Sequence, residues 1–338
     1  MDASEPVIRT EELTKKYGDF TALDRLSITL DRGQILGLIG PNGAGKTTAI
    51  KILVGLARPT SGRATIAGAD CLRESRRIKR LVGYMPDTFG AYDNMRVREY
   101  LDFFGAAFAI PRRERMRRIG EVLELAGAAS MQDLYVESLS HGMRQRIGLA
   151  RTMLHDPQVL ILDEPANGLD PQARIETREI LIRLAEAGKT LIVTSHILPE
   201  LARICSRVAI ITHGRLRAFG TLDEIMRRVR QQRTIEVQLA SVEGLEQAAA
   251  AVRDLAPEAD DVAPSLAESV VRFRSAMPER RLGELLAGLV AAGVEVTQFR
   301  ELHVDLEDAF LFVTHEDDET VVSGAGGPTA EASTRGVV

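Results

Sequence analysis

The feature that most constrains the fold is a glycine-rich loop, GPNGAGKT at residues 40–47, which follows the apolar run Ile35–Ile39. It fits the pattern G-x-x-x-x-G-K-[S/T], in which backbone N–H groups surround the phosphates of a nucleotide. Lys46 is expected to reach the β- and γ-phosphates, and the Thr47 hydroxyl is expected to bind Mg²⁺. Residues 46–56 are predicted to form a helix whose N-terminal dipole faces the anion. The alternative is a glycine turn with an incidental lysine.

Composition narrows the class of protein. The chain has 338 residues, enough for two domains with separate cores. It carries 43 Lys and Arg against 48 Asp and Glu, whereas nucleic-acid binders are usually basic. No apolar run approaches the roughly 18–20 residues that span a bilayer, and the start, MDASEPVIRT, does not resemble a signal peptide. We therefore expect a cytoplasmic protein that binds no nucleic acid and reaches a membrane only through a partner.

Short apolar runs separated by helical patterns predict an α/β fold. Three runs, at 159–162, 191–193 and 208–211, are typical of parallel strands that are buried on both faces. Helical periodicity lies between them at 143–154 and 173–187. Further strands are predicted within 7–30, at 63–66 and at 81–85.

Residues 96–129 are predicted to be helical, because apolar side chains recur at three- and four-residue steps. A solvated helix face is the simpler explanation for the basic side chains between them, and a contact with polyphosphate or lipid is the alternative. These side chains are Arg112, Arg113, Arg115, Arg117 and Arg118.

A second, smaller domain is predicted at 230–315, after a first domain at 6–225 whose helical subdomain covers about 90–150. The pattern of the second domain is β-α-β-α-β-α, and its last helix is expected at 306–313. Residues 316–338 are acidic, then rich in Gly, Ser, Thr and Ala, and are predicted to be disordered. The strands of this domain are expected at 235–239, 270–273 and 294–299, and its first two helices at 242–255 and 282–289.

The apolar run at 159–162 ends in two carboxylates, Asp163 and Glu164. Asp163 is expected to orient Mg²⁺ through the water molecules that this ion retains. Glu164 is expected to polarise the water that attacks the γ-phosphate. Phosphoryl transfer requires mainly positioning and charge neutralisation, which a lysine, a metal ion and one carboxylate supply. Taken alone, the pair is also compatible with an acidic turn.

Four further motifs occur in the order LSHGM at 139–143, LDEP at 162–165, ANGLD at 166–170 and TSH at 194–196. With the glycine-rich loop, they resemble the nucleotide-binding subunit of ABC transporters from residue 7 to about residue 222. The implied fold is an α/β P-loop NTPase with an antiparallel β subdomain and a helical subdomain, here followed by a small C-terminal α/β domain. The implied activity is ATP hydrolysis coupled to transport.

The resemblance also implies roles for single residues. Tyr17 matches the aromatic residue that stacks on adenine, and His196 matches the switch residue that senses the γ-phosphate and joins Lys46 and Glu164 in catalysis. Ser140 and Gly142 match the signature element, which contacts ATP bound by the other subunit, and Asp170 matches the aspartate that communicates across the dimer. The matched phosphate-loop residues are Gly40, Asn42, Gly43, Gly45, Lys46, Thr47 and Thr48.

Two residues depart from the common family pattern. Asp87 stands where most members have a metal-contacting glutamine, so it is expected to join Thr47 and Asp163 at Mg²⁺ with more charge and a shorter reach. His141 replaces the first glycine of LSGGQ, which removes some backbone freedom. Both variants resemble bacterial drug, antibiotic and sodium exporters with a separate permease, and LEDAFL at 306–311 resembles the end of their C-terminal domain.

The resemblance implies partners as well. Two copies are expected to form a head-to-tail dimer on binding ATP and Mg²⁺, each site combining one phosphate loop with residues 140–142 of the other copy. An integral-membrane permease at the inner face of the cell membrane is expected to contact residues 92–104. The alternative is a soluble relative that acts on ribosomes or in DNA repair, which the single phosphate loop and the acidic balance disfavour. A regulator without turnover is disfavoured by the presence of Glu164.

Overall fold

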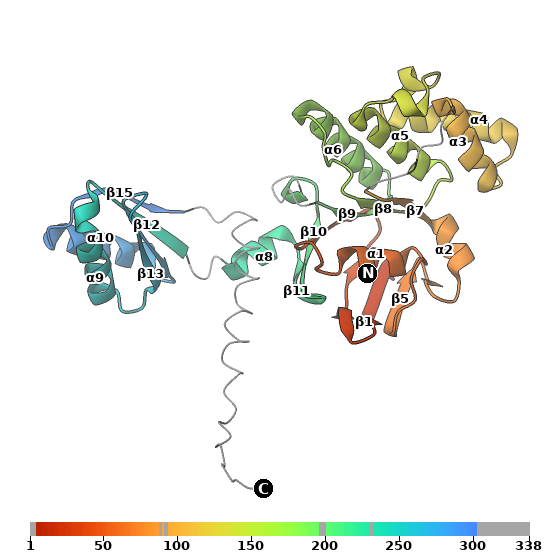
Figure 1. Cartoon of the computed structure of the whole chain (residues 1–338). Helices are drawn as coiled ribbons and strands as arrows, with labels where there is room; N and C mark the ends of the chain where they lie inside the picture. The colour runs from red at the N-terminus through yellow and green to blue at the C-terminus, as the bar shows by residue number, and fades with distance from the viewer. Residues whose placement is uncertain (1–4, 88–89, 91–93, 196–200, 230–232, 303–338) are drawn as a thin grey trace, which may run out of the picture.

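The computed structural model describes residues 5–87, 90, 94–195, 201–229 and 233–302. A six-stranded sheet forms the centre of the first unit, in the order β11-β10-β4-β9-β8-β7 (Figure 1). Neighbouring strands are parallel except β10 and β11, which are antiparallel. The strands are β4 (Ile35–Ile39), β7 (Val82–Met85), β8 (Val159–Asp163), β9 (Thr190–Thr194), β10 (Arg207–Thr212) and β11 (Arg215–Gly220).

The central strands are apolar on both faces because the sheet separates two hydrophobic cores. In β4, Ile35 and Ile39 belong to one core, whereas Leu36 and Leu38 belong to the other. Parallel strands that are covered on both faces show this continuous apolar pattern. The predicted buried parallel sheet is therefore confirmed.

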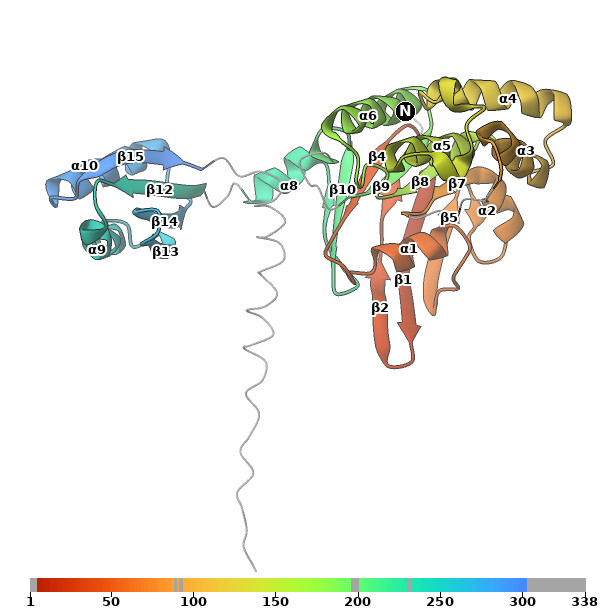
Figure 2. The ribbon, with the colours of Figure 1, turned by 45° about the horizontal axis from the view of Figure 1, so that its top comes forward.

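Helices cover one face of this sheet, and a helix with a second sheet covers the other (Figure 2). On the first side lie α3 (Val97–Ala107), α4 (Arg112–Leu125), α5 (His141–Met153) and α6 (Pro171–Glu186). Short 3₁₀ helices at Ala129–Met131 and Val136–Ser138 connect α4 to α5.

On the other side, an antiparallel sheet packs with α1 (Lys46–Leu53), and α2 (Ser75–Leu81) precedes β7. The sheet has the order β2-β1-β5-β6, and β3 pairs with β1. The predicted antiparallel and helical subdomains of the fold class are confirmed. The strands are β1 (Ile8–Tyr17), β2 (Phe20–Leu26), β3 (Thr29–Leu30), β5 (Ser61–Ile66) and β6 (Ala69–Asp70).

Helix α1 is shorter than predicted, since it ends at Leu53 rather than at residue 56. Gly55 has a φ of +74°, a conformation that favours glycine and that ends helices. The Leu56 N–H then bonds back to the Lys51 carbonyl at 2.8 Å. The prediction was too long because the apolar periodicity continues beyond the residue at which Gly55 ends the helix.

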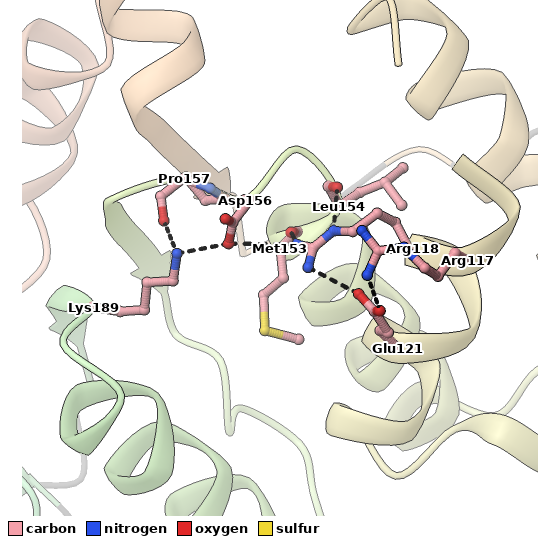
Figure 3. Close-up of polar contacts among 8 residues, drawn as sticks. All are labelled: Arg117, Arg118, Glu121, Met153, Leu154, Asp156, Pro157 and Lys189. Carbon is pink, nitrogen blue, oxygen red and sulfur yellow. Dashed lines mark hydrogen bonds and ion pairs between the residues drawn. The ribbon is translucent and has the colours of Figure 1, made fainter. Parts of the chain in front are cut away.

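The expectation of a solvated arginine face on α4 is wrong for two of its five arginines. The side chains of Arg115 and Arg118 are only 14% and 18% exposed. Arg115 pairs with Asp102 of α3 at 2.5 Å. Arg118 donates to the Met153 carbonyl at 2.9 Å, at the C-terminal end of α5 (Figure 3). These arginines therefore join helices to one another, since guanidinium groups bind free helix-end carbonyls well.

The smaller unit is an antiparallel sheet of order β13-β14-β12-β15 whose core is shared with two helices. Its sequence of elements is β-α-β-β-α-β, so the prediction missed one strand, Asp260–Ser265. That strand lies at an edge of the sheet, has no buried residue, and contains Pro264, so it lacks apolar alternation. The predicted helix at 306–313 and the predicted disordered tail lie outside the described residues. The elements are β12 (Arg233–Leu239), α9 (Leu245–Leu255), β13 (Asp260–Ser265), β14 (Val270–Ser275), α10 (Glu279–Ala291) and β15 (Val296–Glu301), and α8 (Leu222–Val229) precedes them.

Across the described part of the chain, we find no helix with the length and apolar character that a bilayer crossing requires.

Candidate nucleotide-binding site

The glycine-rich loop joins the carboxyl end of β4 to the first turn of α1. Its glycines are required by close packing and by backbone conformation. A Cβ on Gly40 would lie 2.2 Å from the Ile211 carbonyl oxygen, and one on Gly45 would lie 2.6 Å from the Ala22 carbonyl oxygen. Gly45 also has a φ of +107°, which side-chain-bearing residues rarely adopt. The loop thus brings backbone N–H groups to the end of the sheet.

The Lys46 ammonium group is held over this loop. Its Nζ donates to the carbonyl oxygens of Gly40 at 2.5 Å and Pro41 at 3.0 Å. Burial lowers the pKa of Lys46 from its ordinary value, while the negative charges of Glu164 and Asp163 oppose that shift. Lysine therefore lies between the loop and the two carboxylates, where it can neutralise phosphate charge.

The two carboxylates are positioned by Thr194, which sequence reasoning did not single out. Strands β8 and β9 pair Asp163 with Thr194. The Thr194 hydroxyl donates to Asp163 Oδ1 at 2.6 Å and accepts from the Glu164 N–H at 2.9 Å. Glu164 has a φ of +52°, so the chain turns sharply here. The TSH motif contained this signal, but only its histidine was interpreted.

A cavity of about 580 Å³ lies between the loop, the β8 end and the β1–β2 hairpin. It brings together ten of the predicted site residues, from four separate segments. Phe20 and Tyr84 also line it and were not predicted. The predicted residues are Tyr17, Asn42, Gly43, Gly45, Lys46, Thr47, Thr48, Asp87, Asp163 and Glu164.

Aromatic residues form the outer side of the cavity. Tyr17 and Phe20 are paired across the β1–β2 hairpin, and the two residues are 51% and 65% exposed. Lys15 Nζ lies 4.7 Å from the Tyr17 ring centroid. Exposed aromatic rings beside a phosphate loop offer a stacking surface for a planar base. Deeper in the cavity, burial, together with the charges of Asp163 and Asp87, raises the pKa of Tyr84 to about 12, so its hydroxyl stays a donor.

The residues present suit a Mg²⁺ ion that is shared with phosphate oxygens. The Thr47 hydroxyl and the carboxylates of Asp163 and Asp87 line one cavity. Within the described ranges, no group of three or more His, Cys, Asp or Glu side chains is arranged to hold a metal by itself. Mg²⁺ is usually held by one or two carboxylates together with substrate phosphates and water, so this sparse oxygen set is compatible with it.

Other predicted residues lie elsewhere. Ser140 is the N-cap of α5, where its hydroxyl accepts from the Met143 N–H at 3.3 Å, and Gly142 follows in the first turn. Asp170 caps α6 by accepting from the Ala173 N–H at 2.9 Å. Both capping residues thus have a structural role within this chain. His196 lies outside the described residues.

A phosphate loop between a buried strand and a helix, beside a second strand that ends in two carboxylates, defines a P-loop nucleotide-binding protein. A sequence profile described as ABC transporter matches residues 23–167. Daunorubicin resistance ATP-binding protein DrrA2 of Streptomyces coeruleorubidus is 35% identical over 319 residues, which cover 93% of this chain and 97% of that protein. The chain therefore belongs to the ABC transporter family, as one of its ATP-binding proteins, and the predicted family is confirmed.

Two further matches each cover about two thirds of the chain. An ABC transporter ATP-binding protein of Synechocystis is 41% identical over 229 residues, which cover 65% of this chain. The chain spans 64% of that relative's length, slightly less than two thirds. A solved ATP-binding subunit of an ABC transporter is 30% identical, with a TM-score of 0.61, over 66% of this chain and 93% of that one. The predicted P-loop ATPase fold is thus confirmed for the first unit.

Proposed function

We propose that this chain binds and hydrolyses ATP with Mg²⁺ to power export of a small molecule through a separate membrane permease. The observation that carries this proposal is the cavity in which Lys46, Thr47, Asp163 and Glu164 meet. The family supplies the class of protein, and the cavity supplies the chemistry.

Each residue has a role that follows from its charge and position. Lys46 and the loop N–H groups bind the phosphates, and Tyr17 stacks on the base. Thr47, Asp163 and Asp87 would hold Mg²⁺, which when bound neutralises phosphate charge. Glu164 orients the water that attacks the γ-phosphate, and His196 assists at that phosphate. Because such transfer depends on positioning and charge neutralisation, these groups are sufficient in kind.

The second half of each site comes from another copy of the chain. Ser140 and Gly142 lie at the start of α5, outside the cavity that holds Lys46. In a head-to-tail dimer, the α5 start of one copy closes the cavity of the other over ATP. ATP then favours the closed dimer because it binds that state more tightly, and hydrolysis removes this preference.

The permease partner and the exported molecule are inferred from relatives. DrrA2 is named for resistance to daunorubicin, which favours a drug or antibiotic as cargo. We place this chain in the cytoplasm, peripheral on the inner face of the cell membrane, with the segment around residues 92–104 against the permease. Its six-stranded sheet and its acidic net charge of −5 give no support to a nucleic-acid partner.

The proposal is tested with the purified full-length chain and its Glu164→Gln variant. The wild type should hydrolyse ATP only with Mg²⁺, and the variant should retain ATP and accumulate a dimer on size-exclusion chromatography. Full-rate turnover by the variant without a dimer would contradict the role of Glu164. For the transport assignment, affinity capture from solubilised membranes should recover a polytopic membrane protein, and recovery of ribosomes or DNA instead would contradict it.

A further inference from the structure

The two residues that depart from the family pattern, Asp87 and His141, contact the same residue, Asn167. Asn167 Nδ2 donates to Asp87 Oδ1 at 3.3 Å, and its backbone carbonyl oxygen lies 2.7 Å from His141 Nε2. Asp87 follows β7, Asn167 follows β8, and His141 begins α5. One residue therefore connects the edge of the nucleotide cavity to the signature helix.

The contact at Asn167 is extended by close packing of the next residues. Gly168 has a φ of +69°, and a Cβ there would lie 3.0 Å from His141 Nε2. A Cβ on Gly142 would lie 3.2 Å from Leu169 Cδ2, and Leu169 is only 5% exposed. The start of α5 and the loop after β8 are thus packed so closely that an additional carbon atom would require the neighbouring side chain to shift by a few tenths of an ångström.

The loop after β8 is in turn tied to Glu164. The Asn167 N–H donates to the Glu164 carbonyl oxygen at 3.1 Å, which closes a tight turn. Glu164 is itself held through its N–H by Thr194 at 2.9 Å. Consecutive hydrogen bonds therefore connect Thr194, Glu164 and Asn167.

The chemistry of the His141 contact depends on the imidazole. A carbonyl oxygen only accepts, so Nε2 of His141 must carry the proton and donate. A glycine, which the LSGGQ pattern has at this position, has no side chain to make this bond. The hydrogen bond between α5 and the loop after β8 therefore depends on the histidine of LSHGM.

We propose that His141 is a positioning residue that couples Ser140 at the start of α5 to the loop that carries Glu164 and Asn167. Asp87 holds the same loop from the side of the cavity, so the two family departures act together. This inference rests on the proposed function, because it gives Ser140 its importance in closing the partner's site. Within one copy, however, the coupling is a direct contact between residues of the same chain.

The test compares His141→Ala with His141→Gln. Gln offers an amide N–H that can replace the imidazole donor, whereas Ala offers none. His141→Ala should increase amide hydrogen exchange in residues 166–170 and lower the ATPase kcat by about five- to tenfold, the size expected for loss of one hydrogen bond. The exchange measurement is made without nucleotide, so that it reports the contact within one copy and not the contact of residues 140–142 with ATP of the partner copy. His141→Gln should restore most of both properties.

A second comparison separates the two hydrogen bonds of Asn167, one with Asp87 and one with His141. Asn167→Ala removes the amide that reaches Asp87 but keeps the backbone carbonyl that accepts from His141. It should therefore raise exchange in residues 166–170 less than the double variant Asn167→Ala/His141→Ala does. Because both hydrogen bonds hold the same loop, the increases in exchange caused by Asn167→Ala and His141→Ala should not simply add in the double variant.

Different results would overturn the role of His141 and the proposed ATPase function. A wild type without Mg²⁺-dependent ATPase activity would overturn the proposed function, while exchange in nucleotide-free protein still tests the contact. Unchanged exchange at 166–170 in His141→Ala would overturn the inference even in an active enzyme. Equal behaviour of the Ala and Gln variants would overturn the role of the donor.

Discussion

The two ends of the β8–β9 pair each carry an aspartate, and the partners of these aspartates differ. Before β8, Asp156 accepts from Lys189 Nζ at 2.8 Å and lies 3.5 Å from Arg118 (Figure 3). At the other end, Asp163 accepts from the neutral Thr194 hydroxyl at 2.6 Å. Cations largely neutralise the first carboxylate, whereas a hydroxyl orients the second and leaves its charge for a ligand.

This difference distinguishes an acid that holds structure from one that is available for chemistry. The hydrogen bond from Lys189 is the largest cause that lowers the pKa of Asp156. The only basic side chain that we describe in the cavity with Asp163 is Lys46, whose ammonium is hydrogen-bonded to loop carbonyls. The amino end of the strand pair thus fixes helices α4 and α5, and the carboxyl end is open to nucleotide.

The largest expected effect follows from removing the cation at the open end. Lys46→Ala should lower ATPase activity by about 100-fold or more, the order of magnitude for loss of one group that stabilises transition-state charge. Steady-state hydrolysis at saturating Mg²⁺ and ATP measures this. Lys189→Ala is the matched control, since it removes a lysine from the other end and should leave most activity intact. Equal losses of ATPase activity in Lys46→Ala and Lys189→Ala would contradict the difference between the two ends of the strand pair.

Replacing Thr194 tests how the carboxylates are held. Thr194→Val removes the hydroxyl that binds Asp163 and the Glu164 N–H, and it leaves that buried N–H without its acceptor. Turnover should fall about 30-fold, in line with two lost hydrogen bonds of roughly 1 kcal/mol each. The Mg²⁺ concentration for half-maximal activity should rise. Thr194→Ser keeps the hydroxyl and should retain most activity, and a Ser variant as impaired as Val would contradict the role of this group.

Local sequence predicted the site where its parts are contiguous. The phosphate loop and the pair Asp163–Glu164 each follow an apolar strand, so their place at the carboxyl edge of a parallel sheet could be expected. Thr194 acts through the neighbouring strand, and its register with Asp163 is a tertiary fact that no local pattern encodes. The same holds for the contact of His141 with Asn167, which joins residues 26 positions apart.

The fold was predictable where burial produces a pattern. The central strands of the six-stranded sheet are apolar on both faces, and this signal is strong even in five residues. Strand β13 at the edge of the smaller sheet has no buried residue, so burial leaves no pattern in its sequence. Arg118 looked like a surface residue because its charge indicates solvent, whereas its partners are carbonyls at the end of another helix.

The pH dependence of stability tests the amino end of the β8–β9 pair, where Asp156 lies. His155 stacks on Phe108 with ring centroids 3.9 Å apart, and burial lowers its pKa to about 4. Between pH 6.5 and 4 the unfolded chain binds a proton at this imidazole and the folded chain does not, so stability falls as pH falls. The loss should be about 1 kcal/mol at pH 5.5. Urea unfolding at pH 7.5 and 5.5 should show it in the wild type, while His155→Gln should lack this component.

The smallest expected effect concerns Asp156 itself. Asp156 has a φ of +56°, which asparagine also tolerates, so Asp156→Asn removes the charge with little change in backbone preference. The side chain is 68% exposed, so water screens its ion pairs with Lys189 and Arg118. The free energy of unfolding at pH 7.5 should therefore fall by only about 0.5 kcal/mol. ATPase activity should be unchanged, whereas Asp163→Asn, the same substitution at the open end, should abolish most turnover with little loss of stability. If Asp156→Asn reduced turnover as strongly as Asp163→Asn, the two ends could not be divided into a structural one and a chemical one.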